Sequence, residues 1–278
     1  MENYLFKIPE LNCSYNQKDI VLKISDLVIP SKKISILLGI SGAGKSTFLE
    51  TLGLMNNTFF NGSLIFNPNN GSKPINLSKV WASEKNISEI RNRYYSFIFQ
   101  NTNLMPNFTA LENVCITQMI QGLSFEEAKD NAKSVLGKMG LSEIENNKKV
   151  YELSGGQQQR LAFVRAITPT YSVLFGDEPT GNLDEYNSEE LMKIIREQIM
   201  ESNKSAIIVS HNINLALKYA DFIMIIDKPK GMQYGEINRN TVYSSSVNEN
   251  GTTTWFDSNN QPVSEIKELI QEKLFSNN

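Results

Sequence analysis

Apolar residues in this 278-residue chain gather in short runs that are separated by polar and helical segments. Five runs have the length and composition of buried strands, at residues 34–38, 94–100, 172–177, 205–210 and 222–227. Helical patterns lie between the later runs. Strands that alternate with helices predict an α/β fold whose mostly parallel sheet is covered on both faces.

The region before the first buried run shows the alternation that is typical of half-buried strands. It predicts strands at 4–8, 20–24 and 26–29. Residues 30–33, with the sequence Pro-Ser-Lys-Lys, predict a turn that leads into the first buried strand.

Residues 109–139 show helical periodicity and carry two start signals. Thr109 with Glu112, and Ser124 with Glu127, have the spacing of capping boxes, in which side chains bind the free N–H groups of a helix start. The sequence therefore predicts helices that begin at these positions.

Two other regions are more polar and turn-rich. Residues 56–93 predict a hairpin at 62–66 and otherwise a loop. Near the C-terminus, the pattern predicts a hairpin around 231–243 and a helix after Ser264. The apolar face expected for that helix consists of Ile266, Leu269, Ile270 and Leu274.

A glycine-rich run joins the strand at 34–38 to a helix predicted at 47–55 and matches the pattern G-x-x-x-x-G-K-[ST]. Small residues let successive backbone N–H groups surround phosphate oxygens, and the helix N-terminus adds free donors and partial positive charge. Lys45 can reach the β- and γ-phosphates, and the Ser46 hydroxyl can bind Mg²⁺. The residues expected to contact a nucleotide here are Gly39, Ser41, Gly42, Ala43, Gly44, Lys45, Ser46 and Thr47.

The charge and cysteine content narrow the class of protein. The formal net charge is −3 and no block of lysine or arginine stands out, so no nucleic-acid partner is expected. Cys13 and Cys115 have no metal-binding or redox spacing and are expected to be reduced thiols. The longest apolar stretches, near Leu37 and Ile225, fall short of the ~20 residues that cross a bilayer. Any membrane role is therefore expected to depend on a partner.

Polar residues follow other predicted strands. Asp177 closes the run 172–177, where its carboxylate suits Mg²⁺, although a helix N-cap is the alternative role. Glu178 comes next and can face an attacking water. Gln100 ends another strand and has the simple alternative of a polar exit residue. His211, the only histidine, follows the strand 205–210 and has a structural polar role as its alternative.

The segment Leu153–Arg160 has the sequence LSGGQQQR, in which a serine and two glycines precede an apolar helix. Ser154 predicts an N-cap, and the two glycines allow a phosphate to approach the backbone closely. A helix start without any ligand is the alternative.

Five motifs follow one another along the chain in an order that resembles that of the ATP-binding cassette (ABC) family. They are the phosphate loop at 39–47, Gln100, the LSGGQ segment 153–157, the run 172–184 and the segment 209–211. The resemblance implies ATP and Mg²⁺ as cofactors. It also implies a P-loop ATPase core with a mostly parallel sheet, an N-terminal antiparallel β sub-domain and an α-helical sub-domain.

The resemblance assigns roles to residues that local pattern alone leaves open. It makes Glu178 the general base, His211 a γ-phosphate contact and Gln100 a sensor of the γ-phosphate that also reaches Mg²⁺. Tyr15 would stack on adenine, and Asp184 would link the two active sites of a dimer. Mg²⁺ would be held by Ser46, Gln100 and Asp177, and the ATP of a second subunit would be contacted by Ser154, Gly155, Gly156 and Gln157.

The resemblance also implies partners and a division of the chain. The ATPase domain would span 1–227, with the helical sub-domain at about 101–165, and 228–278 would form an extension. The segments 99–100, 103–106, 111–114 and 176–184 are similar to those of the subgroup that contains lipoprotein-releasing, macrolide-export and cell-division ATPases.

These implications predict an ATP-hydrolysing subunit that dimerises with a second copy of itself. It would act on a separate transmembrane permease at the inner face of the cell membrane. A soluble ABC ATPase, such as one for iron–sulfur cluster assembly, and a non-hydrolysing regulatory cassette are the alternatives. The intact residues Lys45, Asp177, Glu178, Gln100 and His211 argue against the regulatory cassette.

Overall fold

The computed structural model describes residues 3–142, 148–181, 183–228 and 231–275. Asn182, within the predicted motif at 172–184, lies outside the described residues. The predicted α/β fold is confirmed, with a large sheet whose central strands are parallel and a smaller sheet that is mostly antiparallel.

The strands of the two sheets are distributed along the whole chain. Their bounds are β1 Tyr4–Cys13, β2 Leu22–Pro30, β3 Ile34–Leu38, β4 Phe59–Gly62, β5 Ile65–Phe66, β6 Ile75–Asn76, β7 Tyr95–Ile98, β8 Val173–Asp177, β9 Ser205–Ser210, β10 Phe222–Ile225, β11 Gly235–Ile237, β12 Val242–Val247, β13 Thr253–Phe256 and β14 Pro262–Val263.

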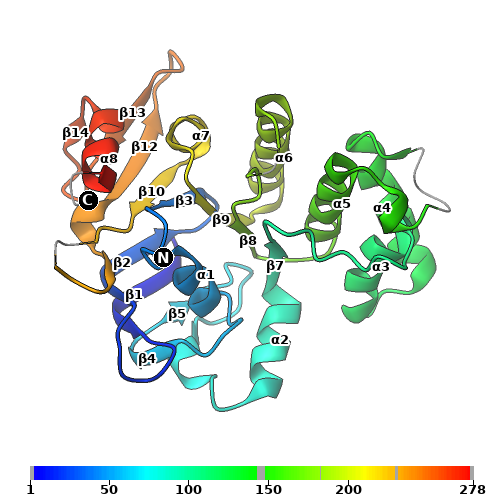
Figure 1. Cartoon of the computed structure of the whole chain (residues 1–278), viewed down its shortest axis with the longest axis horizontal. Coiled ribbons are helices and arrows are strands. Elements are labelled where there is room, and N and C mark those ends of the chain that lie inside the picture. Colours follow the sequence, from blue (N-terminus) through cyan, green and yellow to red (C-terminus); the bar gives the residue numbers. More distant parts are fainter. Residues whose placement is uncertain (1–2, 143–147, 182, 229–230, 276–278) are drawn as a thin grey trace.

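The helices cover the sheets and build one separate lobe. Their bounds are α1 Lys45–Leu52, α2 Glu84–Tyr94, α3 Ala110–Ile120, α4 Phe125–Lys138, α5 Gly155–Ile167, α6 Glu185–Ser202, α7 Ile213–Tyr219 and α8 Ile266–Phe275. Figure 1 shows α3, α4 and α5 together at the right, beyond the edge strand β7, and α1 on the opposite side of that strand.

The large sheet has the strand order β14-β13-β12-β10-β3-β9-β8-β7. The strands β10, β3, β9, β8 and β7 pair in parallel, so their carboxyl ends meet at one edge. The loops that leave this edge carry the phosphate loop after β3, Gln100 after β7, Glu178 after β8 and His211 after β9. The topology therefore gathers segments that are far apart in the sequence.

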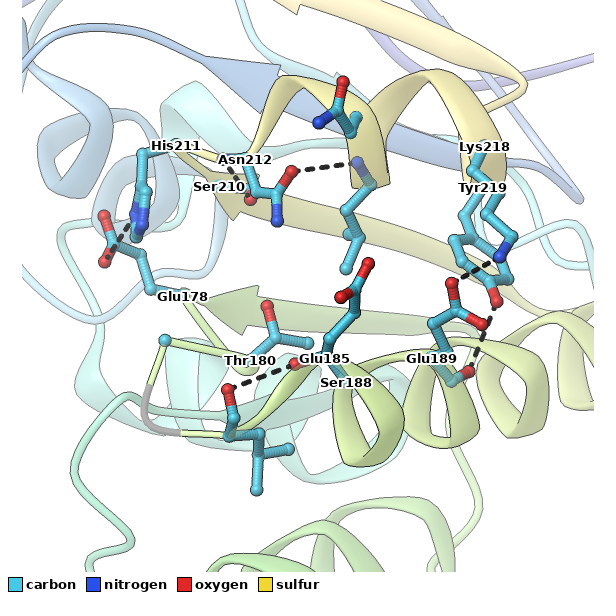
Figure 2. Close-up of a pocket in the computed structure, with 14 residues that line it drawn as sticks. Glu178, Thr180, Glu185, Ser188, Glu189, Ser210, His211, Asn212, Lys218 and Tyr219 are labelled. Atoms are coloured by element: carbon cyan, nitrogen blue, oxygen red, sulfur yellow. Dashed lines mark hydrogen bonds and ion pairs between the residues drawn. The ribbon is translucent and has the colours of Figure 1, made fainter.

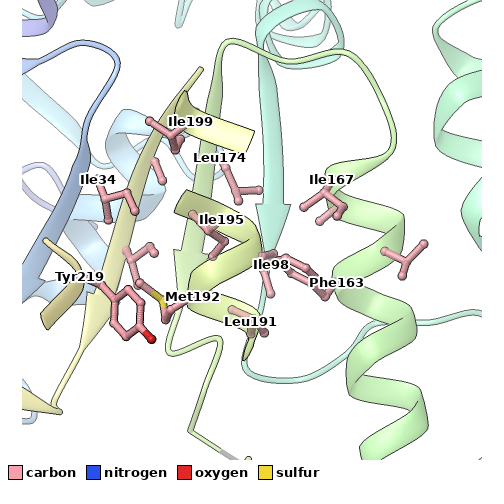
Figure 3. Packing of buried hydrophobic residues seen from close by; sticks show 14 of the residues in the cluster. Ile34, Ile98, Phe163, Ile167, Leu174, Leu191, Met192, Ile195, Ile199 and Tyr219 are labelled. Carbon is pink, nitrogen blue, oxygen red and sulfur yellow. The ribbon is translucent and has the colours of Figure 1, made fainter. Parts of the chain in front are cut away.

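The central strands are buried on both faces. Along β3, Ile36 packs into one hydrophobic cluster and Leu37 into the other, as expected when side chains alternate between faces. Figure 3 shows part of the first cluster, to which α6 contributes Leu191 and Ile195 and α5 contributes Phe163. The second cluster contains α1 and the smaller sheet. This double burial explains why the strand runs are almost continuously apolar.

The smaller sheet differs from the prediction in its strand boundaries. The segments predicted as separate strands at 20–24 and 26–29 form one strand, β2, and β1 continues past residue 8 to Cys13. The two strands pair antiparallel as far as Cys13 opposite Leu22, and this ladder determines their length. Asp26, in the middle of β2, has a φ of +49°. This local irregularity lies where the sequence pattern predicted the second of two separate strands.

Residues 56–93 contain more regular structure than predicted. The predicted hairpin at 62–66 is wrong, because β4 and β5 each pair with β1, and β5 also pairs with β6. The expected loop also contains α2, which Ser83 caps and whose Ile87, Ile90 and Tyr94 are buried. These three residues have helical spacing, but the other residues of α2 are strongly polar, so the sequence pattern of an amphipathic helix is weak here.

The C-terminal hairpin lies at a different place from the one predicted at 231–243. In that range β11 pairs with β2 in the small sheet, whereas β12 pairs with β10 in the large sheet. Each strand thereby covers an open sheet edge, and the hairpin forms between β12 and β13. The predicted helix is confirmed as α8, whose Ile270 and Leu274 are buried in the first cluster.

Candidate functional site

The phosphate loop joins β3 to α1 with two residues in the left-handed region. Gly42 has a φ of +73° and Gly44 a φ of +105°, which only glycine adopts without strain. Gly44 is also the N-cap of α1, and no side chain caps this helix among the residues described, whereas side chains cap α3, α4 and α5. The N–H donors of α1 are therefore left for an anion.

Lys45 folds back over this loop. Its Nζ donates to the carbonyl oxygens of Gly39 at 2.8 Å and Ile40 at 3.1 Å. An ammonium group has three N–H donors, so one remains for a phosphate even while both contacts are kept. The two bonds place the positive charge above the loop.

A cavity of about 350 Å³ opens in front of the loop. It collects most of the predicted phosphate-binding and metal-binding residues, together with one residue that the sequence did not indicate, Val21. Its lining consists of Val21, Ser41, Gly42, Gly44, Lys45, Ser46, Thr47, Gln100, Asp177 and Glu178.

Asp177 lies at the carboxyl end of β8 and is not a helix N-cap, because α6 begins later with Asp184 as its cap. Burial raises the pKa of the Asp177 carboxyl, the negative charge of Glu178 raises it further, and Lys45 opposes both effects. Burial and the Glu178 charge together therefore outweigh the compensation that Lys45 provides. A bound cation would add compensating positive charge.

The donors around Asp177 suit Mg²⁺. Ser46 and Gln100 line the same cavity and offer hydroxyl and amide oxygens. Within the described part of the chain, no group of three or more His, Cys, Asp or Glu side chains is arranged to hold a metal ion. A metal at Asp177 would thus take further ligands from phosphate and water, as Mg²⁺ usually does beside nucleotides.

Glu178 and His211 form a pair at the end of β8 and β9. The Glu178 Oε2 atom lies 3.3 Å from His211 Nδ1 (Figure 2). The Glu178 backbone N–H donates to the Val209 carbonyl at 3.0 Å, and its φ is +46°. A glutamate whose backbone lies in the left-handed region carries conformational strain of about 1–3 kcal/mol, and such strain often occurs at functional sites.

Glu178 also borders a second cavity, of about 570 Å³, between the start of α6 and α7. Figure 2 shows this space, with Glu178 and His211 at one end and the Lys218–Glu189 ion pair at the other. The Glu178 carboxylate therefore stands between the phosphate-loop cavity and a second open space. A water on that side can reach the carboxylate.

Tyr15 lies beside α1, in the connection between β1 and β2. Its hydroxyl is 3.1 Å from Thr47 Oγ1 and donates to Glu50 Oε2 at 2.8 Å. The residue is 54% exposed, so its ring offers a surface to a ligand. The structure thus places Tyr15 next to the helix that follows the phosphate loop, although Tyr15 does not line the cavity itself.

The structure does not bring the segment Ser154–Gln157 to the phosphate-loop cavity. This segment starts α5 in the helical lobe (Figure 1), with Ser154 as N-cap and Gln157 completing a capping box. Asp184 also stays outside the cavity, where it caps α6 by accepting from the Asn187 N–H at 2.8 Å. That bond lowers the pKa of Asp184.

Gly235 of β11 supports the phosphate loop from behind and was missed by the sequence analysis. Its N–H donates to the Val21 carbonyl at 2.9 Å, and a methyl group in its place would overlap the carbonyl oxygen of Ala43. Ala43 is only 1% exposed. A glycine within the hairpin predicted at 231–243 was the available signal, but its partner is 192 positions earlier by residue number, 235 against 43.

Known protein families include one that matches this chain. The ABC transporter family matches residues 22–181, which is more than half of the chain. The chain belongs to the ABC transporter family and is an ATP-binding ATPase of that family.

Individual relatives give a narrower likeness. The lipoprotein-releasing system ATP-binding protein LolD of Zymomonas mobilis is 35% identical, over 81% of this chain and 94% of the relative. LolD of Coxiella burnetii is 37% identical, over 77% of this chain and 86% of the relative. Within the described residues, no helix combines the length and apolar character needed to span a bilayer.

Solved ABC cassettes share the fold. The dimeric bacterial ABC transporter cassette MJ0796 is 28% identical, with a TM-score of 0.68, over 80% of this chain and 94% of that chain. The cbiO1 subunit from Clostridium perfringens is 25% identical, with a TM-score of 0.70, over 84% of this chain and 87% of its own. One MJ0796 structure is described as a post-hydrolysis state that is bound to ADP and Pi.

Replacing Asp177 should stabilise the nucleotide-free protein. Its raised pKa means that the folded state favours the protonated form, so stability is lost as pH rises through that pKa. Asp177→Asn should raise the unfolding temperature at pH 7, and the gain over wild type should shrink toward pH ~4, near the unfolded pKa of aspartate. Thermal unfolding at several pH values measures this. Asp130→Asn, an exposed change on α4, is the control, and an equal gain at every pH would contradict the prediction.

Adding one methyl group at Gly235 should weaken ATP binding. Gly235→Ala must displace either β11 or the Ala43 carbonyl, and overpacking of this kind costs about 1–3 kcal/mol, so we expect a roughly tenfold higher Kd for MgATP. Calorimetric titration measures the Kd. Gly137→Ala on α4 is the matched control, since the nearest atom to its added methyl is 3.5 Å away. A folded Gly235→Ala protein with unchanged affinity would show that β11 yields instead of the loop.

Proposed function

We propose that this chain is the ATP-hydrolysing subunit of a membrane complex of the lipoprotein-releasing type, and that two copies bind two ATP molecules between them. The observation that carries the proposal is the separation, within one chain, of the phosphate loop from an exposed pair of glycines at the start of α5. The lipoprotein-releasing names of the relatives favour the membrane class over the soluble alternative.

The glycines of α5 have no evident purpose inside the chain. Gly155 and Gly156 are exposed, neither has a positive φ, and a methyl group on Gly155 would meet nothing within 4 Å. Glycine in a helix costs about 1 kcal/mol relative to alanine. A bare helix N-terminus that faces solvent suits close approach by a phosphate, and a second copy of this chain can bring one.

A two-fold dimer supplies what each half lacks. In an isologous pair, Ser154, Gly155, Gly156 and Gln157 of each chain face the ATP on the phosphate loop of the other chain. Asp184, exposed at the start of α6, is the proposed link between the two sites. The solved cassette with the same fold is a dimer, which supports this arrangement.

The proposed chemistry divides among the residues of the first cavity. Lys45 and the loop N–H groups hold the β- and γ-phosphates, and Ser46, Gln100 and Asp177 hold Mg²⁺, which neutralises phosphate charge when bound. Glu178 orients the attacking water and accepts its proton. Its 3.3 Å contact with His211 Nδ1 leaves His211 Nε2 to face the γ-phosphate.

The proposed membrane partner would contact the segment after Gln100. Phe108 is 40% exposed and Met105 is half-buried, whereas Leu104 packs against the first cluster and belongs to the fold. Arg165 of α5 donates to the carbonyls of Thr102 and Asn103, at 2.8 and 2.7 Å. A partner on this segment would be joined both to Gln100 and to the helical lobe, at the inner face of the membrane.

Blocking hydrolysis should trap the proposed dimer. Glu178→Gln removes the base but keeps size and polarity, so turnover should fall at least roughly a hundredfold while ATP binding is kept. Size-exclusion chromatography with MgATP should then show a dimer that is absent with MgADP. Adding Gly155→Glu should abolish this dimer by placing bulk and negative charge at the proposed contact. A Glu178→Gln protein that binds MgATP and stays monomeric would contradict the sandwich arrangement.

Charged substitutions near Gln100 should separate hydrolysis from assembly. Met105→Glu and Phe108→Glu should leave basal ATPase activity of the isolated chain within about twofold, because both side chains reach solvent. They should abolish co-purification with the proposed transmembrane partner. Met200→Glu and Phe275→Glu are matched controls, since these residues are 77% and 58% exposed elsewhere on the surface. Normal assembly of both test variants would place the docking surface elsewhere.

A further inference from the structure

The Tyr15 hydroxyl is held by two residues of α1. It lies 3.1 Å from Thr47 Oγ1 and 2.8 Å from Glu50 Oε2. Thr47 and Glu50 are three residues apart on one helix and therefore share a face. Tyr15 lies in the connection between β1 and β2, 32 residues before Thr47. Its two hydrogen bonds fasten the ring to one turn of α1.

The direction of these hydrogen bonds follows from the number of protons. A phenol has one O–H and an ionised carboxylate only accepts, so the Tyr15 proton goes to Glu50 and the Thr47 hydroxyl donates to Tyr15. Burial raises the pKa of the Tyr15 hydroxyl and the Glu50 carboxylate adds to this rise, so the phenol keeps its proton at neutral pH. The chain of donors runs from Thr47 to Tyr15 to Glu50.

A bound nucleotide changes this chain of donors at Thr47. Thr47 lines the phosphate-loop cavity, and phosphate oxygens accept hydrogen bonds only. When the single Thr47 proton turns to a phosphate, the Tyr15 hydroxyl loses that donor. The bond from Tyr15 to Glu50 does not compete with the phosphate and remains.

We propose that Glu50 is a positioning residue for the adenine base: it holds the Tyr15 ring at a fixed place relative to α1 while the nucleotide is bound. The inference rests on the proposed function, in which Tyr15 stacks on adenine and α1 holds the phosphates. Glu50 thus couples base recognition to phosphate recognition through the tyrosine hydroxyl. It touches neither part of the nucleotide.

This assignment predicts which part of the binding energy depends on Glu50. A ligand with a base needs the ring in place, whereas a ligand that consists of phosphates alone does not. The alternative is an electrostatic effect, because the Glu50 charge also reaches Asp177 and raises the pKa of its carboxyl. Removing that charge would change the binding of MgATP and of a base-free phosphate chain alike.

The experiment compares MgATP with magnesium tripolyphosphate by calorimetric titration of the purified full chain. Glu50→Ala should raise the Kd for MgATP roughly three- to tenfold, which is the effect expected from the loss of one hydrogen bond. The Kd for magnesium tripolyphosphate should stay within about twofold of the wild-type value. Glu50→Gln keeps an acceptor oxygen and should restore MgATP affinity. Glu89→Ala, a change to an exposed glutamate on α2, is the matched control.

A double-substitution cycle tests whether Glu50 acts through the hydroxyl. Tyr15→Phe keeps the ring and removes the O–H, so Glu50→Ala should have no further effect on MgATP in the Tyr15→Phe background. Additive losses, equal weakening of both ligands, or unchanged MgATP affinity in Glu50→Ala would each overturn the proposal. If Glu50→Ala does not fold, wild-type affinity in Tyr15→Phe alone overturns it.

Failure of the proposed function has a different signature. Lys45→Ala should lose both ligands, because phosphate binding does not depend on Tyr15. A Lys45→Ala protein that retains both ligands would contradict the phosphate-loop assignment. A wild-type chain that binds the two ligands equally, with Lys45→Ala losing both, would leave phosphate binding intact and overturn the role of Glu50.

Discussion

The structure depends on one electrostatic constraint, the concentration of negative charge where the parallel strands end. Asp177 is partly buried beside Glu178, and both would also face the phosphates of a nucleotide. Lys45 and the uncapped N-terminus of α1 supply the positive side, but burial and the charge of Glu178 together still raise the pKa of the Asp177 carboxyl. Ionisation of Asp177 therefore opposes folding unless a partner of positive charge is bound. In the proposed complex, Mg²⁺ would place positive charge between the Asp177 carboxylate and the phosphates and so offset their mutual repulsion.

The sequence was most informative where chemistry is local. The phosphate loop, the buried strands and the two capping boxes are each contained in a few consecutive residues, and all appear as predicted. The errors concern features that depend on distant partners. The extent of β1 is set by its ladder with β2, and β11 and β12 separate because each completes a different sheet. No local pattern records such pairings.

The candidate site shows the same division. Lys45, Asp177 and Glu178 are recognisable from their motifs, and the topology places them around one cavity. Gly235 and Glu50 have no motif, because one lacks a side chain against Ala43 and the other accepts a hydrogen bond from the Tyr15 hydroxyl. Sequence reasoning finds groups that carry the chemistry, whereas the structure finds those that hold them. The helix cap made by Asp184 lies between these cases, since a motif residue also has a local structural purpose.

The contacts also indicate where a signal from bound ATP can leave the site. The phosphate loop is enclosed: Gly235 packs against Ala43, and the Ile226 N–H donates to the Leu38 carbonyl just before the loop. Support of this kind favours a loop that is already in place before a phosphate binds. The segment after Gln100 is attached differently, since Arg165 of the helical lobe holds the carbonyls of Thr102 and Asn103. In the proposed mechanism, a shift of Gln100 toward a bound metal or phosphate would be passed through Arg165 to α5, the helix whose glycines face the second copy in the proposed dimer. The Arg165 contacts therefore give the proposed coupling between ATP binding and the orientation of the helical lobe a physical path within the chain.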